Sequence, residues 1–201
     1  MEKIKIQFGC GNHKLNNWVN LDLPECDVTL PLKFQDQSVD FVFHEHLIEH
    51  LDEVDGFNFM NECYRILKQG GVMRVSCPSI DGFIKAYQNW EGLSEEYKKE
   101  HGNKSSFFNN ATLRESANYI GKKIEPSGKI SQISNSDGWH KFLYSESDIS
   151  EKLTTIGFKK IVFCQKHQSE HQDLVKLERR FGWGIFSNFP EYIDLTVEAQ
   201  K

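Results

Sequence analysis

The chain has 201 residues, of which 38% are hydrophobic, 26% charged and 12% aromatic. These values predict one well-buried globular domain and exclude wholesale disorder. The formal net charge is -5 without a long basic run, so we expect no nucleic-acid partner. No apolar stretch is long enough to span a bilayer and no apolar leader is present, so we expect no membrane association and a cytoplasmic location. Five cysteines without a Cys-x-x-Cys pair predict neither a disulfide framework nor a zinc ribbon.

The first part of the chain predicts short strands that end in tight loops. Residues 4–8 alternate weakly and run into Gly9-Cys10-Gly11, a pattern typical of a strand that breaks into a turn. Residues 18–22 predict a second strand that ends in an acid, Asp22. Residues 39–43 form a run of β-branched and aromatic residues, which favours a strand covered on both faces.

The middle of the chain predicts a helix, a strand and an insertion. Asp52 is a candidate N-cap, and apolar residues recur at helical spacing up to Leu67, before an expected stop at Gly70-Gly71. Residues 72–76 predict the next strand. The segment 79–140 is polar but carries aromatic residues, which indicates a mostly helical cap inserted into the domain. These aromatic residues are expected to form the core of the cap or, less so, a stacking platform for a sugar ring. They are Phe83, Tyr87, Trp90, Phe107 and Phe108.

The C-terminal part returns to the alternation of helix and strand. Residues 145–148 resemble a capping box, and the helix that follows is expected to stop at Gly157. Residues 158–164 and 192–199 predict the last two strands. Strands that alternate with helices indicate an α/β sheet with helices on its faces. Because both flanks of the insertion are needed to complete that sheet, we expect residues 1–201 to form a single domain.

Gly9, Gly11 and Asp22 predict a nucleotide-type site at the carboxyl ends of the first two strands. Glycine lets the backbone turn sharply and lets a ligand lie against it, and a carboxylate can accept two hydrogen bonds from a ribose diol. A dinucleotide site requires a third glycine where Lys14 stands and an acid about 20 residues further on. Asp22 comes too early for a full crossover helix, so NAD is disfavoured.

Several ordered motifs resemble class I S-adenosylmethionine (SAM)-dependent methyltransferases, most closely a bacterial and phage branch often found with cell-surface polysaccharide genes. The family has a glycine motif, a G-W-x-N-x-D strand, a D-L-x-x-P-L segment, an H-x-L-E-H turn, an E-x-x-R-V-L-K-P-G-G helix end, and later H-x-x-x-Y and G-F motifs. The stretches that resemble them are residues 8–11, 18–22, 27–32, 38–50, 62–71, 140–144 and 157–158.

The resemblance implies a Rossmann-like three-layer sandwich. Its mostly parallel seven-stranded sheet would have an antiparallel last strand and a helical insertion after strand 5. The chain leaves little room for the usual first helix between Gly11 and Trp18, or for a full third strand between Asp22 and Asp27. We therefore expect the adenine side of the site to be more open than usual.

The resemblance also implies the roles of the site residues, with SAM as cofactor and S-adenosylhomocysteine as product. The glycine loop would line the methionine part, Asp22 would hold the ribose, and Leu23 and Asp27 would lie near the adenine. The residues after the fourth strand would lie beside the sulfonium. The expected cofactor-binding residues are Phe8, Gly9, Cys10, Gly11, Asp22, Leu23, Asp27, His44, Glu45 and His46.

Methyl transfer to a hydroxyl group requires loss of a proton, for which histidine is the usual base. The candidate catalytic residues are His44, His46 and His140, with Glu45 as a possible partner. Alternatively, His46 and His50 only hydrogen-bond backbone at a strand-to-helix junction. The acceptor is expected to be a small or carbohydrate-linked molecule, methylated at oxygen. A catalytically silent methyltransferase-like binding module is the main alternative.

Two stretches allow other interpretations. His46-x-x-Glu49-His50 formally matches the H-x-x-E-H motif of zinc hydrolases, but no third zinc ligand is evident, so we expect no metal. The charged stretch 167–180 is either a solvated loop and helix or a site where Arg179 and Arg180 meet an anionic acceptor. Acceptor choice is expected to depend on residues 79–140 and 167–187. The oligomeric state is left open.

Overall fold

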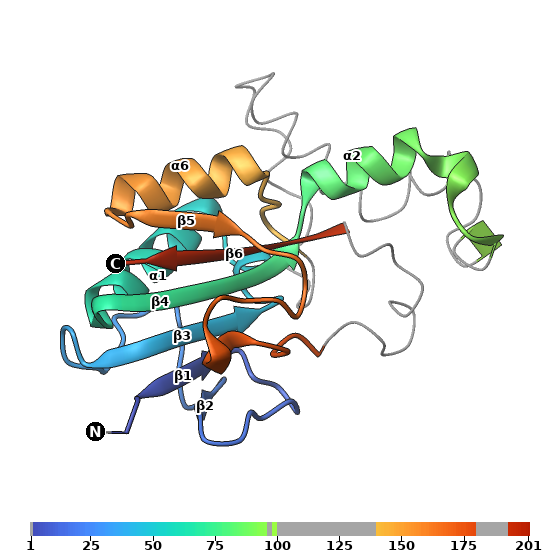
Figure 1. The fold of residues 1–201 in the computed structure, drawn as a ribbon. Helices are drawn as coiled ribbons and strands as arrows, with labels where there is room; N and C mark the ends of the chain where they lie inside the picture. The colour runs from blue at the N-terminus through green and yellow to red at the C-terminus, as the bar shows by residue number, and fades with distance from the viewer. Residues whose placement is uncertain (1, 96–97, 100–139, 180–192) are drawn as a thin grey trace.

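A computed structural model describes residues 2–95, 98–99, 140–179 and 193–201 and places them around one mixed sheet (Figure 1). The described part of the sheet has six strands in the order β2-β1-β3-β4-β6-β5. Neighbours β2, β1, β3 and β4 are parallel, and β6 is antiparallel to both β4 and β5. The strands are β1 (Lys5–Phe8), β2 (Val19–Leu21), β3 (Val39–Glu45), β4 (Leu67–Pro78), β5 (Lys160–Phe163) and β6 (Asp194–Gln200). The predicted mostly parallel α/β sheet with an antiparallel last strand is therefore confirmed.

Local capping signals define the helix ends. The Asp52 side chain accepts from the amides of Val54 and Asp55 and starts α1 (Glu53–Ile66). Ser145 and Asp148 form a reciprocal capping box at the start of α6 (Glu146–Ile156), which ends at Gly157 with a φ of 119°. The other described helices are α2 (Ile80–Gln88) and the 3₁₀ turns η1 (Ile48–His50), η2 (Trp90–Gly92) and η3 (Gln172–Leu174). None of the described helices is long and apolar enough to cross a membrane.

The predicted end of α1 at Gly70-Gly71 is wrong. The helix ends at Ile66, Leu67 is extended, and β4 begins there by pairing with Val39 of β3. Gly70 has a φ of 79° and lies within β4, where its amide donates to the carbonyl of Lys201. Pairing with β3 therefore decides the conformation of Leu67, although its spacing fits the helix. Gly70 and Gly71 lie where the register between β3 and β4 shifts and do not end the helix.

The seventh strand and the first helix are absent from the described residues. Residues 10–18 and 22–38 are turns and loop, as the short spacings of the sequence indicate. Arg65 of α1 fastens the second of these loops, because its guanidinium donates to the carbonyls of Leu32 and Phe34, both at 2.9 Å. Glu62 accepts from the Leu32 amide at 2.8 Å and pairs with Arg65. The loop is thus held against α1 and does not extend the sheet beyond β2.

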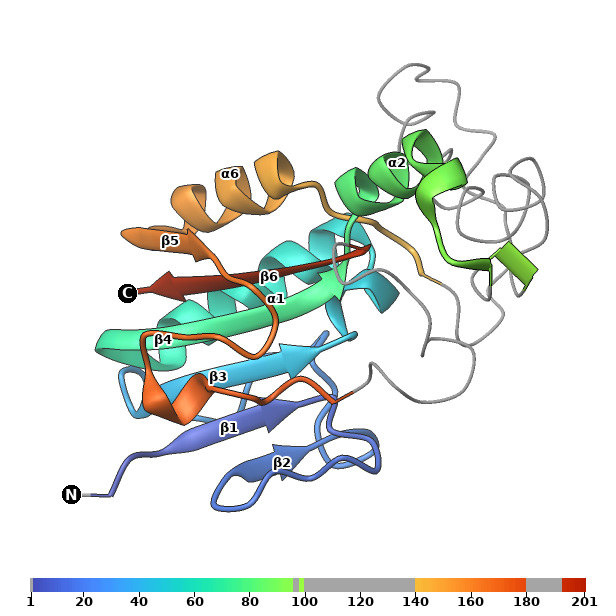
Figure 2. The ribbon, with the colours of Figure 1, turned by 45° about the vertical axis from the view of Figure 1, so that its right-hand side comes forward.

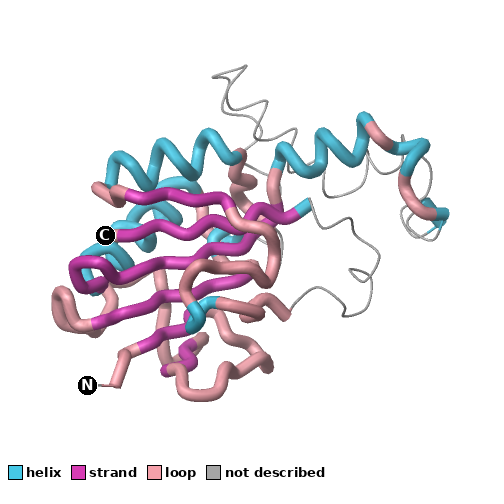
Figure 3. Tube along the Cα trace, in the orientation of Figure 1, coloured by secondary structure: helices cyan, strands magenta, loops and turns pink. Residues whose placement is uncertain are grey.

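The two faces of the sheet are covered differently. Helices α1 and α6 pack together on one face, where they bury the largest hydrophobic cluster (Figure 2). On the other face, the described cover is the segment 164–179, which is loop apart from η3 (Figure 3). Its Leu174 and Leu177 pack with Phe41, Phe43 and further apolar residues. The expectation of helices on both faces is therefore not met by the described residues. The interpretation of 167–180 as a solvated loop and helix is wrong at Leu174 and Leu177, which are buried.

Helix α2 is the described beginning of the predicted insertion and extends from the carboxyl end of β4. Phe83 and Trp90 are buried together with Leu143 and Ile193 in a separate apolar cluster. Tyr87 is half-buried. Phe83 and Trp90 therefore act as core, as expected for most of the aromatic residues in the insertion. Residues 96–97 and 100–139 of the predicted cap, which include Phe107 and Phe108, lie outside the described residues.

Candidate functional site

The glycine loop lies at the edge where β1 to β4 all end and from which α2 extends (Figure 2). Gly9 and Gly11 adopt positive φ values of 65° and 49°, which a side chain disfavours. The Cys10 amide donates to the carbonyl of Leu21 at 3.2 Å, which ties the loop to the end of β2. A Cβ atom on Gly9 would lie 3.1 Å from the Leu47 side chain. Leu47 is thus packed directly over the glycine loop.

Asp22 holds this loop from the neighbouring strand. One carboxylate oxygen accepts from the Gly11 amide at 2.6 Å, and the other accepts from the Leu23 amide at 2.8 Å. The carboxylate is half-buried, while the Leu23 side chain is 68% exposed. Each carboxylate oxygen has a second acceptor position. Asp22 can therefore order the loop and still accept hydrogen bonds from a ligand diol beside an open apolar surface.

The other predicted cofactor residues near the loop take structural positions. Phe8 is fully buried, with its ring 5.4 Å from that of Phe59. Cys10 is also buried, and burial raises the pKa of its thiol. Asp27 is exposed and accepts from the backbone and hydroxyl of Thr29, which lowers the pKa of its carboxyl. The side chains of Phe8 and Cys10 thus face the core. Of Cys10, only the backbone is left to contact a ligand at the glycine loop.

His44 lies in the core instead of facing the open edge. Its ring is fully buried 5.2 Å from the ring of Phe59. Burial lowers its pKa from 6.5 to about 4, and the charge of Glu49 offsets only part of this effect. Neither ring nitrogen has a hydrogen-bond partner among the described residues. The neutral imidazole therefore behaves as an aromatic core residue in this arrangement.

His46 lies between two carboxylates. Its Nε2 is 2.9 Å from Asp194 Oδ2 and its Nδ1 is 3.2 Å from Glu49 Oε1. Burial disfavours the charged ring, but Asp194 and Glu49 outweigh burial and raise the pKa of His46 from 6.5 to about 10. Burial likewise opposes the charge of Glu49, yet His46 and the neighbouring histidines lower its pKa to about 2. His46 is therefore protonated at neutral pH, and its ring pairs with two carboxylates, while its amide donates to the Ser76 carbonyl at 2.9 Å.

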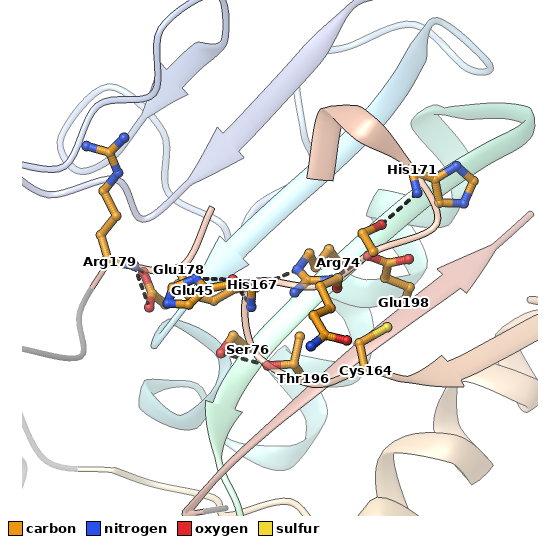
Figure 4. Close-up of polar contacts among 12 residues, drawn as sticks. Glu45, Arg74, Ser76, Cys164, His167, His171, Glu178, Arg179, Thr196 and Glu198 are labelled. Carbon is orange, nitrogen blue, oxygen red and sulfur yellow. Dashed lines mark hydrogen bonds and ion pairs between the residues drawn. The ribbon is translucent and has the colours of Figure 1, made fainter. Parts of the chain in front are cut away.

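Glu45 does not point to an open site but binds the covering segment (Figure 4). Both of its oxygens accept from the Arg179 amide, at 3.0 and 3.1 Å. The Arg179 side chain is exposed and points away from Glu45, as the figure shows. Arg180 lies outside the described residues. Glu45 therefore fixes the backbone of the segment for which an anionic acceptor was one of two interpretations.

A buried ion cluster anchors the same segment to β4. Arg74 Nε donates to Glu178 Oε1 at 2.5 Å, and its Nη1 donates to Glu198 and to the Gln168 carbonyl. Glu178 also accepts from the His167 amide at 3.0 Å. Arg74 and Glu178 are essentially inaccessible to solvent. Glu178 of this stretch thus attaches it to the sheet, a role that the local sequence does not indicate.

A further group of polar side chains gathers around Glu49, which lies two residues after the Leu47 that packs on Gly9. His50 Nε2 and His140 Nε2 lie 3.9 and 4.0 Å from Glu49 Oε1, and the two histidine rings are 5.0 Å apart. His46 and His50 do not share one helix face, because His46 has a φ of 50° and precedes the short turn η1. The zinc-hydrolase arrangement considered from the sequence is therefore wrong, although its Glu49 and His50 do meet His140. Asp194 belongs to the same group, and no sequence signal identified it.

Comparison with known proteins agrees with this fold. Residues 7–75 match the family model of a methyltransferase domain. No curated protein matches the sequence at a significant level. The chain is similar to a SAM-dependent methyltransferase from Methanosarcina mazei, with a TM-score of 0.51 and 12% identity over 100% of this chain and 94% of that one. It is also similar to a SAM-dependent methyltransferase from Archaeoglobus fulgidus, with a TM-score of 0.50 and 15% identity over 99% and 86% of the two chains. The fold is thus Rossmann-like, as in these proteins, and the matched domain supports a methyltransferase enzyme with SAM as its cofactor.

Proposed function

We propose that this protein transfers the methyl group of SAM to an oxygen atom of a small or carbohydrate-linked acceptor. The observation that carries the proposal is the bond between the Asp22 carboxylate and the Gly11 amide, at 2.6 Å, inside the matched methyltransferase domain. It joins the two elements that a nucleoside-containing cofactor needs, a glycine turn and a carboxylate for its ribose. The saccharide part of the proposal rests on the resemblance of the ordered motifs.

The residues at the carboxyl edge fit SAM. Gly9 and Gly11 present backbone without side chains, and the half-buried Asp22 keeps acceptor capacity for a ribose diol. The exposed Leu23 side chain offers an apolar surface for the adenine, and the exposed Asp27 carboxylate can accept from its amino group. These five residues would hold the cofactor, while Phe8 and His44 would support the strands that carry it.

The chemistry that SAM supplies when bound is a methyl group on a positively charged sulfur. The acceptor oxygen would take this methyl group, the electron pair of the broken carbon–sulfur bond would stay on sulfur, and the hydroxyl proton would have to leave. Of the three predicted bases, His46 is protonated and His44 is enclosed. His140 is partly exposed, with 24% of its side chain accessible, so we propose His140 as the proton acceptor.

The acceptor is proposed to bind where α2 and the covering segment flank the carboxyl edge. Arg179 is exposed there and can meet an anionic group. All five cysteines are free, which suits a reducing compartment such as the cytoplasm. No nucleic acid is proposed as a partner, because the net charge is -5 without a basic run.

Binding without turnover is the second candidate function. It is favoured by one observation, namely that two of the three predicted bases are unable to accept a proton from an acceptor in the described arrangement. A silent module would retain Gly9, Gly11 and Asp22 and would bind SAM or S-adenosylhomocysteine. The two functions therefore differ only in product formation.

Calorimetry with S-adenosylhomocysteine tests the cofactor site first. Wild-type protein is expected to bind it, and Asp22→Ala is expected to weaken binding by about tenfold or more, since charge-assisted hydrogen bonds contribute ~1.5–3 kcal/mol. Asp55→Ala in the first turn of α1 is the matched control and should leave the affinity unchanged. Asp27→Ala tests the adenine contact: weaker S-adenosylhomocysteine binding supports that contact, and unchanged affinity leaves Asp27 only its role in the turn with Thr29. Absence of binding by the wild type, or equal binding by Asp22→Ala, would refute the proposed cofactor site.

Product formation then separates an enzyme from a silent module. The protein is incubated with SAM and with panels of sugars, nucleotides and amines, and S-adenosylhomocysteine release is measured. Release with a hydroxyl acceptor that is lost in His140→Ala supports the proposed reaction. Binding without release on any panel favours the silent module, and release with amines only would contradict methylation at oxygen.

A further inference from the structure

We propose that Glu49, His50 and His140 bind a divalent transition-metal ion of the Zn²⁺ type. One ligand atom from each residue lies within 4.8 Å of the other two. In a tetrahedral zinc site, bonds of about 2.0–2.1 Å separate ligand atoms by about 3.3 Å. The distances of 3.9 and 4.0 Å from Glu49 Oε1 to the two Nε2 atoms therefore require only small side-chain adjustments.

Glu49 is the observation that points to a ligand. Its side chain is fully buried, and no described donor meets regular hydrogen-bond geometry at either carboxylate oxygen. The ring of His46 is near, as an ion pair at 3.2 Å. A buried carboxylate normally has hydrogen-bonded partners or binds a metal ion. The buried carboxylate next to two further imidazoles thus matches the donor set of a metal site.

The backbone prebuilds this arrangement from segments far apart in the chain. Glu49 and His50 are adjacent on η1, and the Glu49 carbonyl accepts from the amides of Lys141 and Phe142 at 2.6 and 3.2 Å. These bonds place His140 beside η1. The contacts from Asp194 to His46 and from His46 to Glu49 form a chain that orients the carboxylate. Such outer contacts typically fix the ligands of metal sites.

The donor set selects the class of ion. Two imidazole nitrogens and one carboxylate oxygen favour Zn²⁺ and its transition-metal neighbours over Mg²⁺ and Ca²⁺, which prefer all-oxygen sites. Three protein ligands leave a fourth position for water or a substrate oxygen. Leu47, which precedes η1, contacts Gly9, so the ion would lie near the glycine loop. With the ion bound, His140 Nε2 would be a ligand, so the ion would replace His140 in activating the acceptor hydroxyl; this role rests on the proposed methyltransferase function.

This proposal departs from the sequence-based expectation of no metal. That expectation rested on His46 and His50 as a helical pair and on the absence of a visible third ligand. The structure replaces His46 by Glu49 as the ligand and supplies His140 from 90 residues away, across the insertion. His46 becomes a positioning residue for Glu49.

Zinc titration of the full-length protein tests the site. Protein treated with a chelator is titrated with Zn²⁺ by calorimetry, and Co²⁺ is used in parallel for its visible absorption. We expect one ion per chain, with nitrogen and oxygen ligation in the Co²⁺ spectrum, and a loss of affinity of at least tenfold in His50→Ala and in His140→Ala. His171→Ala, on the opposite face of the sheet, is the matched control.

Further variants keep the proposal testable if one of them fails to fold. Glu49→Gln removes the carboxylate charge, and His46→Ala tests positioning, with an expected tenfold to hundredfold loss of zinc affinity. Far-ultraviolet circular dichroism checks the fold of each variant. Absence of stoichiometric binding, or binding that persists in both His50→Ala and His140→Ala, overturns the metal site. S-adenosylhomocysteine calorimetry on metal-free protein is independent of this outcome, so failure of the metal site and failure of the cofactor site are distinguishable.

Discussion

Replacement of Arg74 by methionine tests whether the buried ion cluster holds the covering segment on the sheet. Arg74 is inaccessible to solvent and donates to two buried carboxylates, Glu178 and Glu198, and to the Gln168 carbonyl. Arg74→Met keeps much of the side-chain volume but leaves two negative charges without their cation. Loss of one partner from a buried ion pair costs about 3–5 kcal/mol. We expect a loss of this size in the free energy of unfolding.

Urea denaturation monitored by circular dichroism measures this loss. Lys3→Ala is the comparison, since its pair with Asp173 is largely exposed and is expected to contribute at most about 1 kcal/mol. Addition of Glu178→Gln to Arg74→Met should restore part of the stability by removing one of the uncompensated charges. A loss below about 1 kcal/mol in Arg74→Met, or no recovery in the double variant, would refute the assigned role of the cluster.

Three further substitutions probe single contacts by thermal denaturation. Gly9→Ala should lower stability by about 1 kcal/mol or more, because it combines a φ of 65° with a Cβ 3.1 Å from Leu47; an unchanged Tm would contradict this. Gly56→Ala places a Cβ 2.3 Å from the Tyr144 hydroxyl and should cost about 1–3 kcal/mol, which Tyr144→Phe in the same chain should largely restore. Ser145→Ala removes the capping box of α6 and should cost about 1 kcal/mol, and a loss below 0.3 kcal/mol would argue against the cap.

The helix caps were predictable because their signals are local. Asp52, Ser145 and Gly157 act on atoms within four residues along the chain, so their chemistry is visible in the sequence. The same holds for the break of β1 at Gly9, whose positive φ needs no distant partner. The end of α1 was mispredicted because Leu67 satisfies helical spacing, yet its pairing with Val39 depends on a strand 28 residues earlier.

The polar partners of the site were not predictable from local patterns. Glu45 was expected beside the sulfonium, but its acceptor atoms are occupied by an amide 134 residues away. His46 binds Asp194, which is 148 residues away. Periodicity and motif spacing predict which residues lie near the carboxyl edge of the sheet. They do not predict the distant partners of these residues, such as the Arg179 amide and Asp194. The sequence therefore indicates which residues lie near the carboxyl ends of the strands, but not which of them face an open site or how they are protonated.

The turn that contains His46, Glu49 and His50 shows why the letters of a motif do not determine its chemistry. On a regular helix, the spacing of four would place both histidines on one face, and Glu49 would stand beside that pair. Here His46 has a φ of 50° and its amide donates to the Ser76 carbonyl, so the helix begins only at Ile48. This backbone turns His46 toward Asp194 and leaves Glu49 between three imidazoles. With this backbone, His46 and His50 do not form a pair of ligands. In the proposed metal site, Glu49, His50 and His140 are the ligands and His46 orients Glu49. We therefore expect the metal affinity to depend most on Glu49, His50 and His140.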